Sequence, residues 1–244
     1  MRSVDVADVW DARVADRGFM VSLATLAFAA LGLELVVDGT VLTVMGAVPG
    51  YYPLGTQFAV WLGLGAAWLV IAWLLVAWSR RRGVDPLVPR APGSLGHLAW
   101  SRILMCFVAA VLAAILLPLF VAGAWGVTPI RLYLQLYTLH GPGAWLLMLA
   151  WAVYHVGRAF LLGSVLGYAH RAALMGLHRP GAGRVPWGGL VTGVLLGAIG
   201  YLVGGPAAGL VALVCSVLLG LIHVLAGESL RVTAVFAVLV YLFL

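Results

Sequence analysis

Long apolar runs separated by short polar segments dominate the pattern of this 244-residue chain. A helix needs about 20 mostly apolar residues to cross the roughly 30 Å hydrocarbon core of a bilayer. The runs that suit such a helix are residues 19–37, 58–78, 103–125, 141–170, 187–203 and 207–226. A last run, residues 232–244, covers only about 20 Å as a helix. The pattern predicts an all-α, polytopic transmembrane helical bundle of about seven spans: six, plus a short one at the C-terminus.

The first residues of the chain have a different pattern. Within residues 1–17, Val6, Trp10 and Val14 fall on one helical face, and most of the charged residues lie elsewhere. This arrangement is typical of a helix that lies along a membrane surface. We therefore expect an amphipathic interfacial segment at residues 1–17, followed by a single transmembrane domain at residues 18–244.

Three of the polar segments predict specific connections. Residues 38–57 are rich in glycine and aromatic residues, which favours an interfacial loop. Residues 126–143 are expected to form a second loop. The segment Gly204-Gly205-Pro206 is so short that the apolar runs on either side of it are expected to form an antiparallel hairpin.

The two runs of this predicted hairpin carry small residues at four-residue spacing. Such spacing puts the small side chains on one helix face, which lets two backbones approach closely in a membrane. These residues are Gly189, Gly193 and Gly197 in the first run and Ala208, Ala212, Ser216 and Gly220 in the second. The sequence therefore predicts that the two faces meet.

Composition and charge agree with this class of protein. Apolar residues make up 64% of the chain, charged residues 9%, and the mean hydropathy is +1.10, whereas soluble domains have roughly 25% charged residues. The net charge of +6 comes from arginines in the segments between apolar runs, so it indicates topology and not nucleic-acid binding. A cytoplasmic N-terminus places twelve of the fourteen arginines inside. We expect a multi-pass protein of a bacterial cytoplasmic (inner) membrane.

Three of the polar residues within the apolar runs are candidate cofactor-binding residues: His155, Arg158 and His223. Arginine in a span is costly, by about 3 kcal/mol on insertion scales, and normally has a partner. Glu34 is expected near the far end of the first span, at the headgroups, which leaves no carboxylate at the depth of Arg158. The sequence therefore predicts a partner from outside the chain, either a lipid or cofactor headgroup or an acid of another subunit.

The residues do not identify a cofactor. A haem held between His155 and His223 would need both side chains at one depth, and their expected depths differ by about 12 Å. No HxxxH or HExxH pattern is present, so no metal site is predicted.

Two intramembrane enzyme families share short features with the chain. Arg158 and the residues after it are similar to the paired-glutamate motif of the CAAX-type glutamic proteases, but Val153 and Tyr154 stand where the two glutamates belong. Cys106, Arg158 and His223 follow the chain order of the exosortase-type transpeptidases. Each likeness covers a handful of residues, and we assign no family.

The sequence thus favours a non-catalytic integral membrane subunit that packs within a larger membrane protein assembly, surrounded by lipid and holding a lipid or cofactor near Arg158. One alternative is an intramembrane cysteine transpeptidase or protease, with Cys106 as nucleophile, His223 as base and Arg158 binding the oxyanion. Another is a transporter permease whose substrate path passes His155 and Arg158.

Overall fold

The computed structural model describes residues 16–46, 51–89, 96–123, 128–177 and 181–242, and every regular element in these ranges is helical. Five helical stretches are long and apolar enough to cross a membrane, Arg17–Met45, Leu54–Arg81, Ala99–Ala122, Pro129–Gly176 and Trp187–Leu225. The prediction of an all-α membrane protein is confirmed. The predicted interfacial segment, residues 1–17, lies outside the described residues except at its last two positions.

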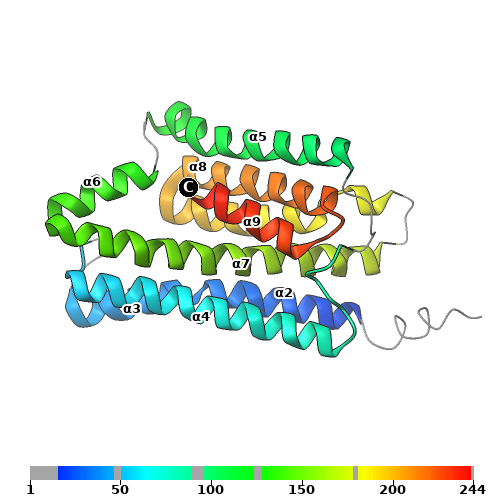
Figure 1. The fold of residues 1–244 in the computed structure, drawn as a ribbon, viewed down its shortest axis with the longest axis horizontal. Helices are drawn as coiled ribbons and strands as arrows, with labels where there is room; N and C mark the ends of the chain where they lie inside the picture. The colour runs from blue at the N-terminus through cyan, green and yellow to red at the C-terminus, as the bar shows by residue number, and fades with distance from the viewer. Residues whose placement is uncertain (1–15, 47–50, 90–95, 124–127, 178–180, 243–244) are drawn as a thin grey trace, which may run out of the picture.

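Helix α7 (Ala144–Gly176) is the centre of the bundle. It packs against α2 and α4 on one side and against α8 and α9 on the other, and it crosses the middle of Figure 1 between these two groups. Its sequence is apolar almost all round, which is typical of a helix surrounded by other helices. The apolar run at residues 141–170 therefore forms the core of the fold.

The first span is longer than the sequence predicted. Helices α2 (Arg17–Leu31) and α3 (Leu33–Met45) continue one another as far as the left-handed cap at Gly46. The prediction of a loop over residues 38–57 was wrong for residues 38–45, which belong to α3, and for residues 54–57, which begin the next helix. Thr40 and Thr43 donate their hydroxyl hydrogens to carbonyls of their own helix, four residues back, at 2.7 Å. Because both hydroxyl groups form hydrogen bonds within the helix, these two polar residues do not end the span.

A break at Gly32 separates α2 from α3. The Gly32 amide donates to the carbonyl of Ala29, three residues back, at 3.0 Å. The carbonyl of Ala30, two residues before the break, accepts a 2.7 Å hydrogen bond from the indole Nε1 of Trp68, a fully buried residue of α4 (Leu54–Arg81). This hydrogen bond connects the end of α2 to the neighbouring helix.

A close helix crossing joins α4 to α7 through two glycines. A Cβ atom on Gly65 would lie 2.7 Å from backbone atoms of Val153 and Tyr154, and one on Gly157 would lie 2.5 Å from the Gly65 carbonyl oxygen. The backbone atoms that such a Cβ would meet cannot move away unless the two helices separate. Glycine is therefore required at both positions by close approach.

Helix α5 (His97–Ala122) lies outermost, against α8, along the upper edge of Figure 1. It ends at Gly123 in a left-handed cap, slightly before the predicted end of its span. The prediction of a loop over residues 126–143 was wrong, because α6 (Thr128–His140) and the short 3-10 helix η1 (Gly141–Gly143) occupy most of it. Tyrosines and an arginine made this segment look less helical than it is.

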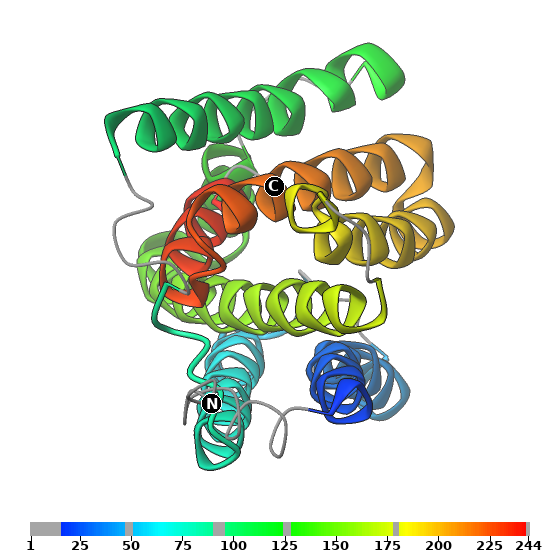
Figure 2. The ribbon, with the colours of Figure 1, turned by 90° about the vertical axis from the view of Figure 1, so that its right-hand side faces the viewer.

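Helix α8 (Trp187–Leu225) consists of two limbs that reverse at Gly205, whose φ is +80°. The limbs run side by side in Figure 2, and a Cβ on Gly189 would lie 2.7 Å from the Ser216 carbonyl oxygen. Likewise, a Cβ on Gly197 would lie 3.2 Å from the carbonyl oxygen of Gly209. The predicted hairpin and its small-residue contact are confirmed. The short 3-10 helix η2 (Ala182–Arg184) precedes α8, and α9 (Leu230–Tyr241) follows it.

Candidate functional site

An ion pair lies between α3 and α7, roughly halfway along α7. Arg158 Nη1 is 3.9 Å from Glu34 Oε2 and donates a 3.3 Å hydrogen bond to the hydroxyl of Tyr154. That hydroxyl in turn donates to Glu34 Oε1. The guanidinium carbon also lies 5.6 Å from the centre of the Tyr241 ring of α9, in a cation–π contact. Three helices thus meet at Arg158.

The expectation that no carboxylate of this chain reaches the depth of Arg158 was wrong. It depended on ending the first span at Val37, which put Glu34 at the headgroups. Because the helix continues to Met45, Glu34 lies at least two turns inside the span. Glu34 is therefore an acid of the same chain that pairs with Arg158. The binding of a lipid or cofactor at Arg158 stays a prediction.

The Glu34–Arg158 pair is open on one side. The side chain of Arg158 is 36% exposed and that of Glu34 is 28% exposed. A guanidinium has five N–H donors in a planar fork, and only Nη1 contacts another polar group among the described residues. Further donors of Arg158 are therefore available to an acceptor that approaches from the open side.

His155 lies one turn from the ion pair, in a more closed environment. Its side chain is buried, its Nδ1 lies 3.1 Å from the Trp151 carbonyl oxygen, and its ring stacks near Trp151 at 4.0 Å between centroids. His155 therefore points toward protein and not toward lipid. These contacts are those of a histidine that bonds to its own helix.

His223 lies at another depth, beside Gly167 of α7. A Cβ on Gly167 would be 3.4 Å from the imidazole Cε1 atom of His223. Gly167 follows Arg158 by nine residues and His155 by twelve, so His223 is about 13 Å from the first and about 18 Å from the second along α7. The structure does not bring His155 and His223 together as paired ligands.

Cys106 belongs to a third region. It packs on the apolar cluster formed by α5, α7, α8 and α9, and its neighbour Phe107 contacts Phe236 with ring centroids 5.3 Å apart. His223 faces α7 and α9, and Arg158 lies about 13 Å away along α7. Cys106, Arg158 and His223 therefore do not form one constellation. Among the described residues, no group of three or more histidine, cysteine and acidic side chains is placed to hold a metal ion.

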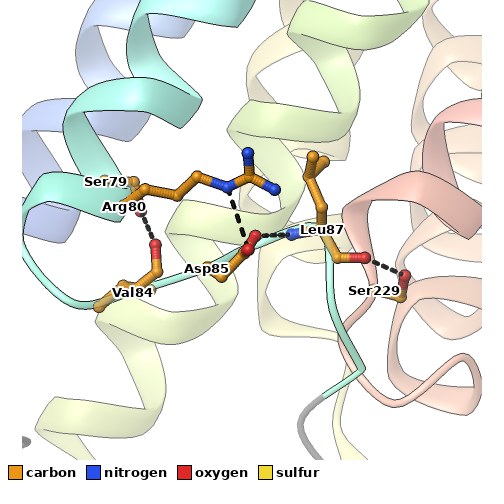
Figure 3. Close-up of polar contacts among 6 residues, drawn as sticks. All are labelled: Ser79, Arg80, Val84, Asp85, Leu87 and Ser229. Carbon is orange, nitrogen blue, oxygen red and sulfur yellow. Dashed lines mark hydrogen bonds and ion pairs between the residues drawn. The ribbon is translucent and has the colours of Figure 1, made fainter.

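A connecting segment, residues 84–89, crosses the arginine-rich end of the bundle; we refer to it as the strap (Figure 3). Ser79 donates a hydrogen bond to the Val84 carbonyl at 2.7 Å, and Arg80 Nε is 3.0 Å from Asp85 Oδ2. Burial alone would raise the pKa of Asp85, but hydrogen bonds from Arg80 and the Leu87 amide hold it below its usual value of 3.8. Asp85 therefore stays ionised and holds the start of the strap to α4.

The far end of the strap is bound to the turn between α8 and α9. Ser229 donates to the Leu87 carbonyl at 3.2 Å, and the Leu230 amide donates to the Pro86 carbonyl at 2.8 Å. The strap thus links α4 to α9 across α7. Nothing in the residues of this segment indicates these partners, so the sequence alone did not predict the link.

No protein-family model matches the chain, and no curated protein or solved structure is similar enough to match it.

Proposed function

We propose that this protein is a non-catalytic, integral membrane subunit whose Glu34–Arg158 pair receives a hydrogen-bonding group from a neighbouring membrane protein. The observation that supports the proposal is the open side of the pair, where about one third of the Arg158 side chain is exposed. In lipid, such exposure leaves a charged group against hydrocarbon, which is costly. A covering helix with a polar side chain removes this cost and supplies an acceptor.

The depth of Arg158 favours a protein partner over a lipid headgroup. Arg158 precedes Arg171 by thirteen residues, or about 20 Å along the helix axis. If Arg171 marks one boundary of a core roughly 30 Å thick, Arg158 lies past the midplane and about 10 Å from the opposite boundary. Lipid phosphates stay at the boundaries, whereas a side chain of a neighbouring helix can lie at any depth. A lipid or cofactor headgroup remains the competing outcome of the test.

We further propose that the N-terminus is cytoplasmic and that the two limbs of α8 are separate spans, so that α9 is the short seventh span. Both follow from the arginine distribution, since positive residues favour the cytoplasmic side. A bacterial inner membrane is the location that this orientation implies.

Cysteine labelling tests the orientation. In a background without Cys106 and Cys215, Gly183→Cys is expected to be protected from an impermeant thiol reagent added to intact cells, and Tyr51→Cys is expected to react. Both positions are suitable, because a Cβ on Gly183 meets no atom within 4 Å and Tyr51 is 63% exposed. The reverse labelling pattern would place the N-terminus outside.

The two alternative functions, an intramembrane cysteine enzyme and a transporter permease, have less support. An intramembrane cysteine enzyme needs its nucleophile, base and oxyanion donor within a few ångströms of one another, and Arg158 and His223 are about 13 Å apart. A permease needs a polar path to Arg158, whereas the lining of the cavity beside His223 does not include Arg158.

Purification from the native membrane in mild detergent, followed by native mass spectrometry, tests the proposal. The wild-type chain is expected to carry a second polypeptide, and Arg158→Leu to lose it. Arg231→Leu is the matched control, because Arg231 is an exposed arginine at the start of α9, and it is expected to retain the partner. A wild-type chain that carries only lipid, or nothing, would contradict the proposal.

A further inference from the structure

A small cavity lies at the arginine-rich end of the bundle, between α7, the α8–α9 turn and the strap. Its lining includes Pro86, Gly167, Tyr168, Arg171, His223 and Glu228. The space is sufficient for about one water molecule. The cavity is about 13 Å from Arg158 along α7, so it is separate from the Glu34–Arg158 pair and does not depend on the function proposed above.

The hydrogen bonds around His223 fix which ring nitrogen carries the proton. The Thr233 hydroxyl donates its one hydrogen to the Ser229 carbonyl at 2.8 Å. It therefore accepts the 2.8 Å hydrogen bond that joins it to His223 Nδ1, so Nδ1 carries the hydrogen. In the neutral ring Nε2 is then an acceptor.

The acceptor Nε2 is buried and faces the cavity. His223 is 2% exposed, and its Nε2 has no hydrogen-bond partner among the described residues. A Cβ on the cavity-lining Gly167 would lie 3.6 Å from Nε2. Across the same cavity, Arg171 Nε and Glu228 Oε2 form an ion pair at 3.7 Å. Buried polar atoms of this kind are normally satisfied by protein or by ordered water.

We propose that this cavity binds one water molecule, which donates a hydrogen bond to His223 Nε2 and a second to the Glu228 carboxylate. A buried water typically makes about three hydrogen bonds, and Arg171, whose guanidinium is a donor, also lines the cavity. The bound water completes a polar network that runs from α7 through His223 and Thr233 to Ser229 and the strap. It is the ligand that holds the α8–α9 turn, the strap and α7 together.

Two glycine variants on one face of α7 separate this water from general packing effects. Gly167→Ala puts a methyl group into the cavity at ordinary contact distance from His223, so it displaces the water without a severe clash. Gly163→Ala, one turn earlier, puts its methyl group against the Leu230 side chain at 3.1 Å. Leu230 also lines the cavity, but this methyl group adds no atom beside His223. Nitrogen-15 NMR of the histidine rings reports on the site, with the His223 signals assigned by their loss in His223→Gln.

The wild type and Gly163→Ala are expected to show a proton on Nδ1, a hydrogen-bonded Nε2 and a water cross-peak to the His223 ring. Gly167→Ala is expected to lose the cross-peak, to shift Nε2 to the value of an unbonded acceptor, and to unfold at a lower temperature than Gly163→Ala. A proton on Nε2 in the wild type, no water cross-peak there, or a metal ion that co-purifies in equimolar amount would each overturn the proposal. These wild-type readings decide the matter even if Gly167→Ala does not fold.

Discussion

Gly65→Leu is expected to lower the free energy of unfolding by about 3 kcal/mol, at the upper end of the range for overpacked cores. Already the Cβ atom would lie 2.7 Å from backbone atoms of Val153 and Tyr154. Backbone atoms in a helix cannot rotate away as a side chain can, so α4 and α7 would have to separate. The contacts of Trp68 with Tyr154 and with the Gly32 break depend on the same crossing, and they would weaken together.

Gly63→Leu is the matched control for this prediction. Gly63 lies two residues earlier on α4, is exposed, and a Cβ there meets no atom within 4 Å. Both variants add the same side chain to the same helix. The difference between their thermal unfolding midpoints in detergent therefore measures the effect of the helix crossing alone. Equal unfolding midpoints for the two variants would show that α4 and α7 do not meet at Gly65.

Removing either charge of the Glu34–Arg158 pair is expected to destabilise the fold, and removing both is expected to restore it. Breaking a fully buried pair costs about 3–5 kcal/mol, because one charge is left alone. Since this pair is partly exposed, we expect about 2 kcal/mol for Arg158→Leu. Glu34→Leu should cost more, because a guanidinium cannot lose its proton, whereas a carboxylate can gain one. The double variant leaves neither charge and should be close to the wild type.

A double-mutant cycle measures this coupling as the difference between the double variant and the sum of the single variants. Arg80 and Asp85 provide the control cycle, because they form an ion pair at 3.0 Å whose side chains are 48% and 38% exposed. Exposed pairs contribute little. If the Glu34–Arg158 coupling is no larger than that of the control cycle, Glu34 is not the partner of Arg158.

Local patterns predicted the parts of the fold that depend on neighbouring residues. The hairpin of α8 followed from the short connection at Gly205 and from small residues on both limbs, since a tight turn brings the two faces together whatever the other helices do. The apolar run at residues 141–170 was correctly expected to form a helix, which is α7. His223 was placed within an apolar run, and it is 2% exposed in the structure.

Contacts between distant segments could not be predicted in this way. Gly65 follows Gly63 by two residues in its span, and nothing in the sequence marks it as the partner of Gly157. The depth of Glu34 was misjudged because Asp38, Gly39 and Thr40 resemble a loop, although the threonine bonds to its own helix. An error of two turns in the end of one helix thus concealed the acid that pairs with Arg158.

Cross-linking in the native membrane tests most directly whether another protein covers the Glu34–Arg158 pair. A photoreactive benzoylphenylalanine in place of Tyr241 puts the reactive group beside Arg158, since the native ring lies 5.6 Å from the guanidinium carbon. The same residue in place of Trp73, which is 66% exposed on α4, is the control on another face. We predict one discrete cross-linked polypeptide from position 241, lost in the Glu34→Leu, Arg158→Leu background and absent from position 73. Cross-links from position 241 to lipid alone, or none at all, would contradict the account.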